Sequence, residues 1–99
     1  MPTYITLVNY TEQGVAEIRE SPERLDDARA LAASMGGELN EWYLTFGEHD
    51  AVAIAEFPDD ETFARFALTV NSLGKVATTT LKAFTEEEYR DVIDGIPEL

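Results

Sequence analysis

The chain has 99 residues and a net charge of −13 at pH 7, because it contains 20 acidic residues and only 7 basic ones. Such a charge repels the phosphates of nucleic acids and the surface of anionic membranes, so we expect neither as a partner. The absence of cysteine excludes disulfides, thiolate metal sites and cysteine nucleophiles.

Length and composition predict a single domain over residues 1–99. Apolar residues make up 44% of the chain, which suits a folded core. No stretch approaches the roughly 18 apolar residues that a membrane-spanning helix needs. Met1-Pro2-Thr3 leads into a strand-like segment without the basic start and apolar stretch of a secretory signal. We therefore expect a cytoplasmic protein.

The acidic residues gather in segments that we expect to be exposed helices and loops, such as Asp59 to Glu61 and Glu86 to Glu88. One hypothesis is a salt-adapted surface of the halophilic kind, whose self-repulsion is screened by concentrated ions. An ordinary acidic cytoplasmic protein is the alternative. The composition leaves both open.

The first third of the chain predicts a strand followed by a helix. Thr3 to Tyr10 is β-branched and aromatic without charge, and both of its faces carry apolar side chains, which favours a central strand. Thr11 is expected to cap a short helical turn. Ser21, followed by Pro22, is expected to cap a longer helix that ends at Gly36-Gly37.

Residues 38–57 predict a β-hairpin with a turn at Gly47-Glu48-His49-Asp50. The first hairpin strand, residues 38–46, carries two glutamates and is expected at the edge of a sheet. The second strand, residues 51–57, is almost wholly apolar and is expected to be central.

The last third of the chain predicts helix, strand and helix. A helix is expected from Asp59 or Asp60 to about Leu73, with Phe63 and Phe66 on its core-facing stripe. Residues 75–84 predict a second edge strand. Thr85-Glu86-Glu87-Glu88 has the pattern of a capping box before a short last helix.

This order of elements predicts an α+β protein with the ferredoxin-like βαββαβ fold: a four-stranded antiparallel sheet with both helices on one face and a short C-terminal helix. The other face must be covered. We expect Tyr4, Val8 and Tyr10 to lie on it with the small residues of the strand at 51–57 and with Val76, Thr78 and Thr80. The simplest cover for such a face is a second copy, so we predict a homodimer or higher homo-oligomer that assembles through the sheet face.

Several segments together resemble the GYD domain family, small proteins of the dimeric α/β-barrel type, and the resemblance covers nearly the whole chain. The motif that names the family falls on Gly47, Glu48, His49 and Asp50, where histidine replaces tyrosine. The segments that carry the resemblance are ESPERLDDARALAASMGGELNEWYLTFG, FGEHD, EFPDDETFARFAL and SLGKVATTTLKAFTEEEY. The resemblance implies the barrel-dimer fold and no established activity.

His49 beside Asp50 is the candidate catalytic pair, because a carboxylate that orients an imidazole makes a general base. The alternative is structural: Asp50 satisfies backbone donors of the turn, and Gly47 supplies a positive φ. Adjacent residues of a strand point to opposite faces, so the two side chains meet only if the turn brings them together.

The resemblance also implies a ligand pocket, because related barrel dimers bind haem or carry out oxygen chemistry on aromatic substrates. The candidate lining residues are Tyr4, Trp42, Tyr43 and His49. A haem would require His49 as its axial ligand. One histidine among scattered acids lacks the spacing of a metal site. We expect no metal and no cofactor.

Two functions follow from these patterns. The first is a non-catalytic oligomeric module that binds a small, fairly apolar ligand or another protein. The second is a cofactor-free enzyme of the dimeric α/β-barrel type, with His49 as acid and base. His49 facing a closed cavity would favour the enzyme, and His49 facing solvent would favour the module.

Overall fold

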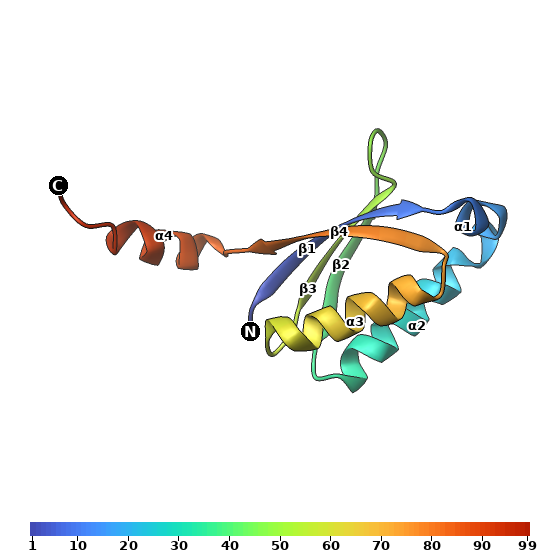
Figure 1. Cartoon of the computed structure of the whole chain (residues 1–99), viewed down its shortest axis with the longest axis horizontal. Coiled ribbons are helices and arrows are strands. Elements are labelled where there is room, and N and C mark those ends of the chain that lie inside the picture. The colour runs from blue at the N-terminus through green and yellow to red at the C-terminus, as the bar shows by residue number, and fades with distance from the viewer.

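The computed structural model describes all 99 residues and contains one four-stranded antiparallel sheet with the strand order β2-β3-β1-β4 (Figure 1). The elements are β1 (Thr3–Tyr10), α1 (Glu12–Ala16), the 3₁₀ helix η1 (Ile18–Glu20), α2 (Ser21–Ser34), β2 (Glu38–Leu44), β3 (Ala51–Glu56), α3 (Asp60–Ser72), β4 (Val76–Ala83) and α4 (Glu86–Asp94). Figure 1 shows α2 and α3 on the same side of the sheet. The predicted ferredoxin-like fold class is confirmed, with β1 and β3 as its central strands.

Three of the predicted helix starts are confirmed by their caps. The Thr11 side chain accepts a hydrogen bond from the Gly14 backbone N–H, and Asp59 accepts one from Thr62. Thr85 and Glu88 form both hydrogen bonds of a capping box. Each cap satisfies backbone donors that the first turn of a helix leaves unpaired.

The predicted cap at Ser21 is wrong. Ser21 already has helical geometry, with φ −60° and ψ −36°, and Glu20 precedes the helix without a side-chain cap. The reason is η1, which runs directly into α2 and so leaves no extended residue between the two helices. Pro22 still occupies the first turn of α2, where its missing N–H costs nothing.

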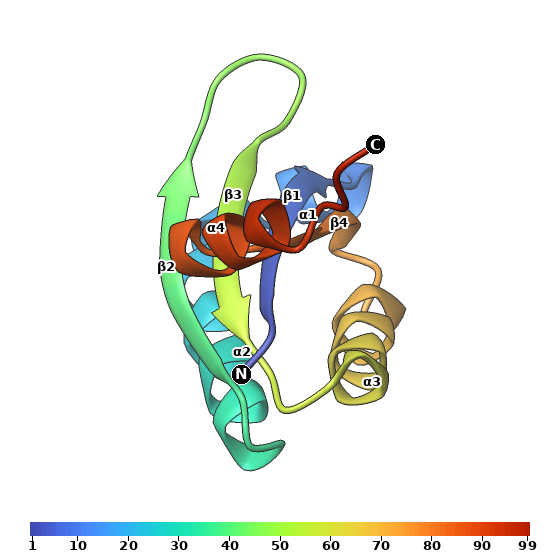
Figure 2. The same ribbon diagram turned by 90° about the vertical axis from the view of Figure 1, so that its left-hand side faces the viewer.

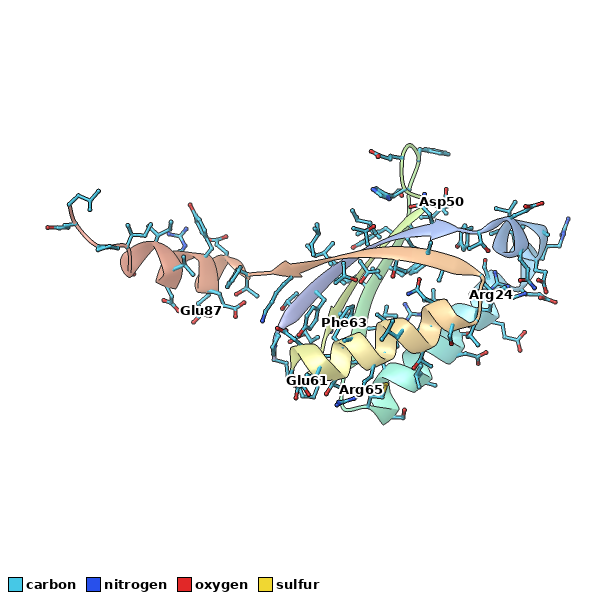
Figure 3. The ribbon with its side chains drawn as sticks, viewed as in Figure 1. Arg24, Asp50, Glu61, Phe63, Arg65 and Glu87 are labelled. Carbon is cyan, nitrogen blue, oxygen red and sulfur yellow. The ribbon has the colours of Figure 1, made fainter.

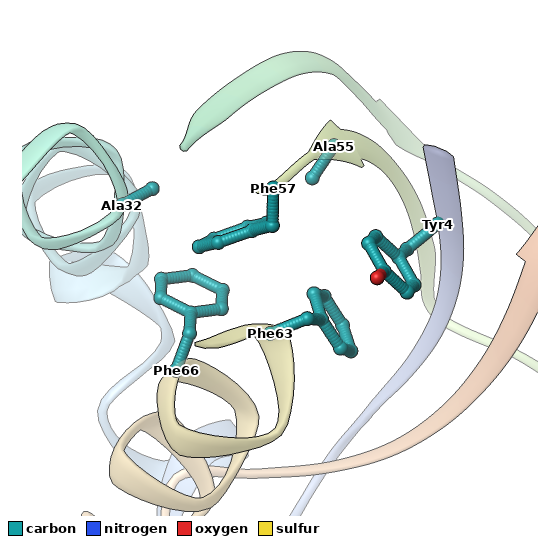
Figure 4. Close-up of a cluster of buried hydrophobic side chains, with 6 residues drawn as sticks. All are labelled: Tyr4, Ala32, Ala55, Phe57, Phe63 and Phe66. Atoms are coloured by element: carbon teal, nitrogen blue, oxygen red, sulfur yellow. The ribbon is translucent and has the colours of Figure 1, made fainter. Parts of the chain in front are cut away.

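The core lies between the sheet and the two long helices and is built on aromatic rings (Figure 4). The Tyr4 ring stacks on the Phe63 ring, with centroids 4.2 Å apart and an angle of 10° between the planes. Phe57, which is fully buried, meets Phe63 edge-on at 5.3 Å and Phe66 at 4.9 Å. Offset and edge-to-face contacts of this kind add to the stabilisation from burial. Phe63 and Phe66 are core residues, as predicted.

The predicted composition of the uncovered sheet face is wrong. Tyr4 and Val8 are each only 3% exposed, and they face the helices rather than the uncovered side. Tyr10, Thr78 and the alanines of β3 lie on this helix side as well. Because both faces of β1 are apolar, strand alternation alone does not decide which face meets the helices.

The opposite face of the sheet, which we call the open face, consists of the alternate residues of each strand. In the sheet register, Ile5 pairs with Ile54 on one side and with Leu81 on the other. Leu7 likewise pairs with Val52. The face has no helix over it (Figure 1), so apolar cross-strand rows lie uncovered in the single chain.

Two segments project from this body. The loop that joins β2 to β3 rises on the side of the open face, and α4 extends beyond the end of β4 (Figures 1 and 2). Every residue of α4 is exposed, although Tyr89, Val92 and Ile93 give it an apolar side. As a result the molecule measures 55 Å along its longest axis but only 18 Å along its shortest. None of the helices is both long and apolar enough to cross a bilayer.

Gly14 of α1 is buried where the end of β1 meets the start of β4. A Cβ atom at this position would lie 2.0 Å from the backbone oxygen of Lys75. That same oxygen accepts a hydrogen bond of 3.0 Å from the Thr11 backbone N–H, so it is not free to move away. The close approach of two backbones therefore requires glycine.

We expect Gly14→Ala to lower the free energy of unfolding by about 1–3 kcal/mol, the usual cost of overpacking, although alanine normally favours a helix over glycine. Chemical denaturation measures the change. Gly95→Ala is the matched control, because a Cβ there would meet its nearest atom at 3.6 Å. Equal stabilities of the two variants would contradict the close approach.

Candidate functional site

Asp50 joins the hairpin to β1. Its backbone N–H donates to the Val8 oxygen at 2.8 Å, and its carboxylate Oδ2 accepts from the Tyr10 backbone N–H at 2.9 Å. Gly47, at φ +96°, supplies the left-handed residue of the loop. These contacts correspond to the structural role of Asp50 and Gly47 that the sequence offered as the alternative to catalysis.

His49 pairs with Asn9 of β1 rather than with Asp50. Its Nδ1 lies 2.8 Å from Asn9 Oδ1, while Asn9 Nδ2 donates to the Glu48 backbone oxygen at 2.9 Å. Since the Asn9 oxygen can only accept, Nδ1 of His49 carries the proton of this contact. The imidazole is thus held at the base of the loop, on the side of the open face.

The four candidate pocket residues do not come together. Trp42 lines a cavity on the helix side of the sheet, and Tyr4 is stacked in the aromatic core. Tyr43 pairs in register with Val52 of the open face and is 54% exposed. His49 lines neither of the two principal cavities. Figure 3 shows Asp50, the chain neighbour of His49, at the base of the hairpin loop, and Arg24 on the helix side of the sheet.

One cavity, which we call the helix-side cavity, has a volume of about 220 Å³ and lies between α2, α3 and the sheet. Most of its lining residues are apolar, and they come from both helices and all four strands. Its principal apolar walls are Val8, Leu31, Trp42, Phe66, Val70 and Val76. A pocket with apolar walls and a few polar groups is the usual form of a small-molecule site.

The polar lining of the helix-side cavity includes Arg24 from the first half of α2. Its Nη1 donates to the Glu17 backbone oxygen at 3.1 Å and lies 4.0 Å from a Glu20 carboxylate oxygen. Its Nη2 is buried and has no hydrogen-bond partner. It is the only buried side-chain polar atom of the chain without one.

A second, more open groove runs between α3 and β4 and contains Tyr4, Asp60 and Lys82. The Tyr4 hydroxyl donates to Asp60 Oδ1 at 2.5 Å, and Lys82 Nζ lies 3.0 Å from the same oxygen. Burial, followed by this hydrogen bond to a carboxylate, raises the pKa of Tyr4 to about 12. The Tyr4 hydroxyl and then Lys82 lower the pKa of Asp60. No three histidine or acidic side chains of the chain converge to hold a metal ion.

Comparison with known proteins assigns the chain to a family. Residues 4–93 match the sequence profile of the GYD domain. The chain belongs to the GYD domain family. The resemblance carried by the hairpin and by the segments around α2, α3 and β4 is thereby confirmed.

One relative is the glutamine synthetase and cystathionine beta-lyase binding protein of Thermus thermophilus. It is 34% identical over 84 residues, which cover 84% of this GYD domain and 88% of the relative. That protein is therefore similar over almost its whole length.

Solved structures with the same fold include MtbAldR, with a TM-score of 0.68 and 19% identity over 86% of this chain. This chain spans 54% of the length of MtbAldR. TTHA0845 from Thermus thermophilus has a TM-score of 0.55 and 24% identity, over 86% of this chain and 95% of that protein. At such identities the likeness is one of fold.

Sequence reasoning missed Arg24 in this GYD domain. Ser21, Arg24, Ala28, Leu31 and Met35 recur at intervals of three and four residues, so they share one face of α2. The available signal for a buried cation was a single arginine on a helix face whose other residues are small or apolar. It was missed because long basic side chains usually extend to water.

The Tyr4–Asp60 contact predicts a loss of stability in alkali. The unfolded chain releases the Tyr4 proton near its ordinary pKa of 10.0, whereas the folded chain holds it to about 12. The stabilisation of the folded state by the protonated Tyr4 hydroxyl is therefore complete below pH 10.0, and it is lost as the pH rises to about 12. We expect Tyr4→Phe to be less stable by about 1 kcal/mol at pH 7, for want of the hydrogen bond, and to lack this alkaline loss.

Thermal melts of both proteins across this pH range measure the effect. Tyr89→Phe, which alters an exposed ring on α4, is the matched control and should follow the wild-type curve. An alkaline loss of the same size in Tyr4→Phe would contradict the assignment to the buried hydroxyl.

Proposed function

We propose that this GYD domain is a non-catalytic protein-binding module that works as a homodimer. The observation that carries the homodimer is the pair of uncovered apolar surfaces in the single chain, namely the open face of the sheet and the apolar side of α4, whereas the enzyme partner is proposed from a relative's name. Neither surface has the convergent polar groups of an active site. Both have the chemistry of a protein interface.

The open face is suited to packing against another sheet. Its central positions are occupied by Ile5, Leu7, Val52 and Ile54, and Leu81 flanks them on β4. Two sheets that pack face to face interdigitate such side chains across a layer about 10 Å thick. None of these five positions is charged, and the nearest acidic residue in the register is Glu41, opposite Ile54 on the edge strand β2.

A second copy is the occupant that we propose for the open face. A two-fold axis brings the same surface onto itself, so the apolar centre of the open face is complementary to its own copy. Acidic side chains of this face, Glu41 and Glu56, lie on the edge strand β2 and at the end of β3. The position of α4 supports this choice. Only Phe84 and Thr85 separate β4 from α4, and the helix extends past the end of the strand rather than over its own sheet (Figure 1). In the homodimer, the apolar side of α4 packs on the partner copy.

The relative from Thermus thermophilus is named for binding two enzymes, and its similarity spans 88% of its length. We therefore propose that the partner of the homodimer is a metabolic enzyme of this kind, with glutamine synthetase and cystathionine β-lyase as the first candidates. The placement of His49 supports a binding module over the cofactor-free enzyme. Its Nδ1 is engaged with Asn9, Asp50 bonds to the backbone of β1, and neither principal cavity includes either residue in its wall.

We expect Leu81→Asp to convert the dimer into a folded monomer, because it places a charge in the apolar interface while Leu81 is 50% exposed in the single chain. Size-exclusion chromatography with light scattering measures the mass. Leu68→Asp is the matched control: Leu68 lies on α3, on the helix side of the sheet rather than on the open face, and is 72% exposed. A monomeric wild type, or a Leu81→Asp variant that stays dimeric, would overturn the interface.

Two neighbouring residues of β1 face opposite sides of the sheet and therefore test different parts of the structure. Leu7 faces the open side, whereas Val8 is buried against the helices, so Val8→Asp tests the core of each copy. We expect Val8→Asp to be unfolded at every protein concentration, which circular dichroism measures.

Binding to an enzyme partner is the direct test of the function. We expect the purified homodimer to bind glutamine synthetase or cystathionine β-lyase of its own cell saturably in biolayer interferometry. The monomeric Leu81→Asp variant should bind more weakly, because two sites on a dimer act together. No saturable binding to either enzyme would contradict the proposed partner class while leaving the dimer measurement intact.

A further inference from the structure

We propose that the helix-side cavity is a binding site for a small apolar carboxylate, with the Arg24 guanidinium holding the carboxylate and the apolar walls holding the body of the ligand. This site is distinct from the proposed dimer interface. The cavity lies between the sheet and its two long helices, and the open face is the other side of the sheet.

The unpartnered nitrogen of Arg24 points to an anion. A guanidinium is always charged and has only donors, so its buried Nη2 needs an acceptor that the chain does not supply. A planar carboxylate matches the fork of an arginine and accepts from it in a charge-assisted hydrogen bond. Because Arg24 lines the cavity, a carboxylate bound there is the acceptor that we propose for Nη2.

Two of the other polar side chains around the cavity are already engaged. Asn71 Nδ2 donates to the Ala67 oxygen and to Thr78 Oγ1, and its Oδ1 accepts from the Thr78 backbone N–H. Lys75 forms an ion pair with Glu17. Of the two cationic side chains that line the cavity, Arg24 is consequently the one with a buried nitrogen that has no partner.

The acidic neighbours of Arg24 set a limit on the ligand. Asp27 lines the cavity, and a Glu20 carboxylate oxygen lies 4.0 Å from Nη1 of Arg24. These charges repel a ligand with several negative groups. They select a monocarboxylate, in which a single charge meets Arg24 and the remainder is uncharged.

The volume of the cavity sets the size of the apolar body. An apolar cavity of about 150 Å³ in another protein accepts benzene. The helix-side cavity, at about 220 Å³, has room for a somewhat larger group. A linear chain of medium length or a phenylalkyl group meets both requirements, and octanoate is a suitable probe.

Trp42 makes binding measurable in the intact protein. It is the only tryptophan of the chain and lines the cavity, so its fluorescence reports on occupancy. We expect octanoate to change this emission saturably and to bind at least about tenfold more tightly than octanol, which has the same chain without the charge. This difference corresponds to about 1.4 kcal/mol.

Two variants test the parts of the site. Arg24→Met keeps the apolar stem and should abolish the preference for octanoate over octanol. Ala28→Phe fills the cavity from α2 and should abolish binding of both probes. Circular dichroism melts test whether each variant is folded. If a variant is unfolded, the comparison of octanoate with octanol on the wild type still tests the role of the charge.

Three results would overturn the site: no saturable change with octanoate, equal binding of octanoate and octanol by the wild type, or an Arg24→Met variant that keeps the preference. The Leu81→Asp variant separates this inference from the proposed function. Since Leu81 lies on the open face, octanoate should bind that variant as it binds the wild type, whatever its oligomeric state.

Discussion

The stacking of Tyr4 on Phe63 decides which face of the central strand is covered. Tyr4 enters the helix side of the sheet because the rings of α3 and Phe57 receive it there, and because its hydroxyl reaches Asp60 in the first turn of α3. Strand alternation then fixes every other side chain of β1. Val8 and Tyr10 follow Tyr4 toward the helices, and the alternate isoleucine and leucine turn to the open face.

The open face is apolar because Tyr4, Val8 and Tyr10 face the helices, which leaves Ile5 and Leu7 on the other side. An apolar open face would be a liability in a lone acidic domain, since exposed apolar patches and sheet surfaces attract other chains. Here it coexists with α4, whose apolar side is also without cover. Two separate features of one chain are thus consistent with the proposed assembly, and together they support it more strongly than either feature alone.

The sequence predicted the element order, the two central strands and the caps at Thr11, Asp59 and Thr85, because these depend on local pattern and chain chemistry. It did not predict which face of β1 is buried, since Ile5 and Tyr4 are equally suited to a core. That choice depends on aromatic partners from distant segments. It also suggested a pocket of Tyr4, Trp42, Tyr43 and His49, which register separates: Trp42 and Tyr43 are neighbours in the chain and therefore point to opposite faces.

The same alternation separates two binding chemistries. Tyr43 and Trp42 mark the two sides of β2, one on the open face and the other at the helix-side cavity. An arginine in the stripe of α2 is costly in a packed core, because its charge must be satisfied wherever it is buried. The backbone oxygen of Glu17 satisfies only part of the guanidinium. An external anion in the cavity would both fill the empty volume and accept a hydrogen bond from the unpaired arginine nitrogen. A methionine in place of the arginine would only fill space.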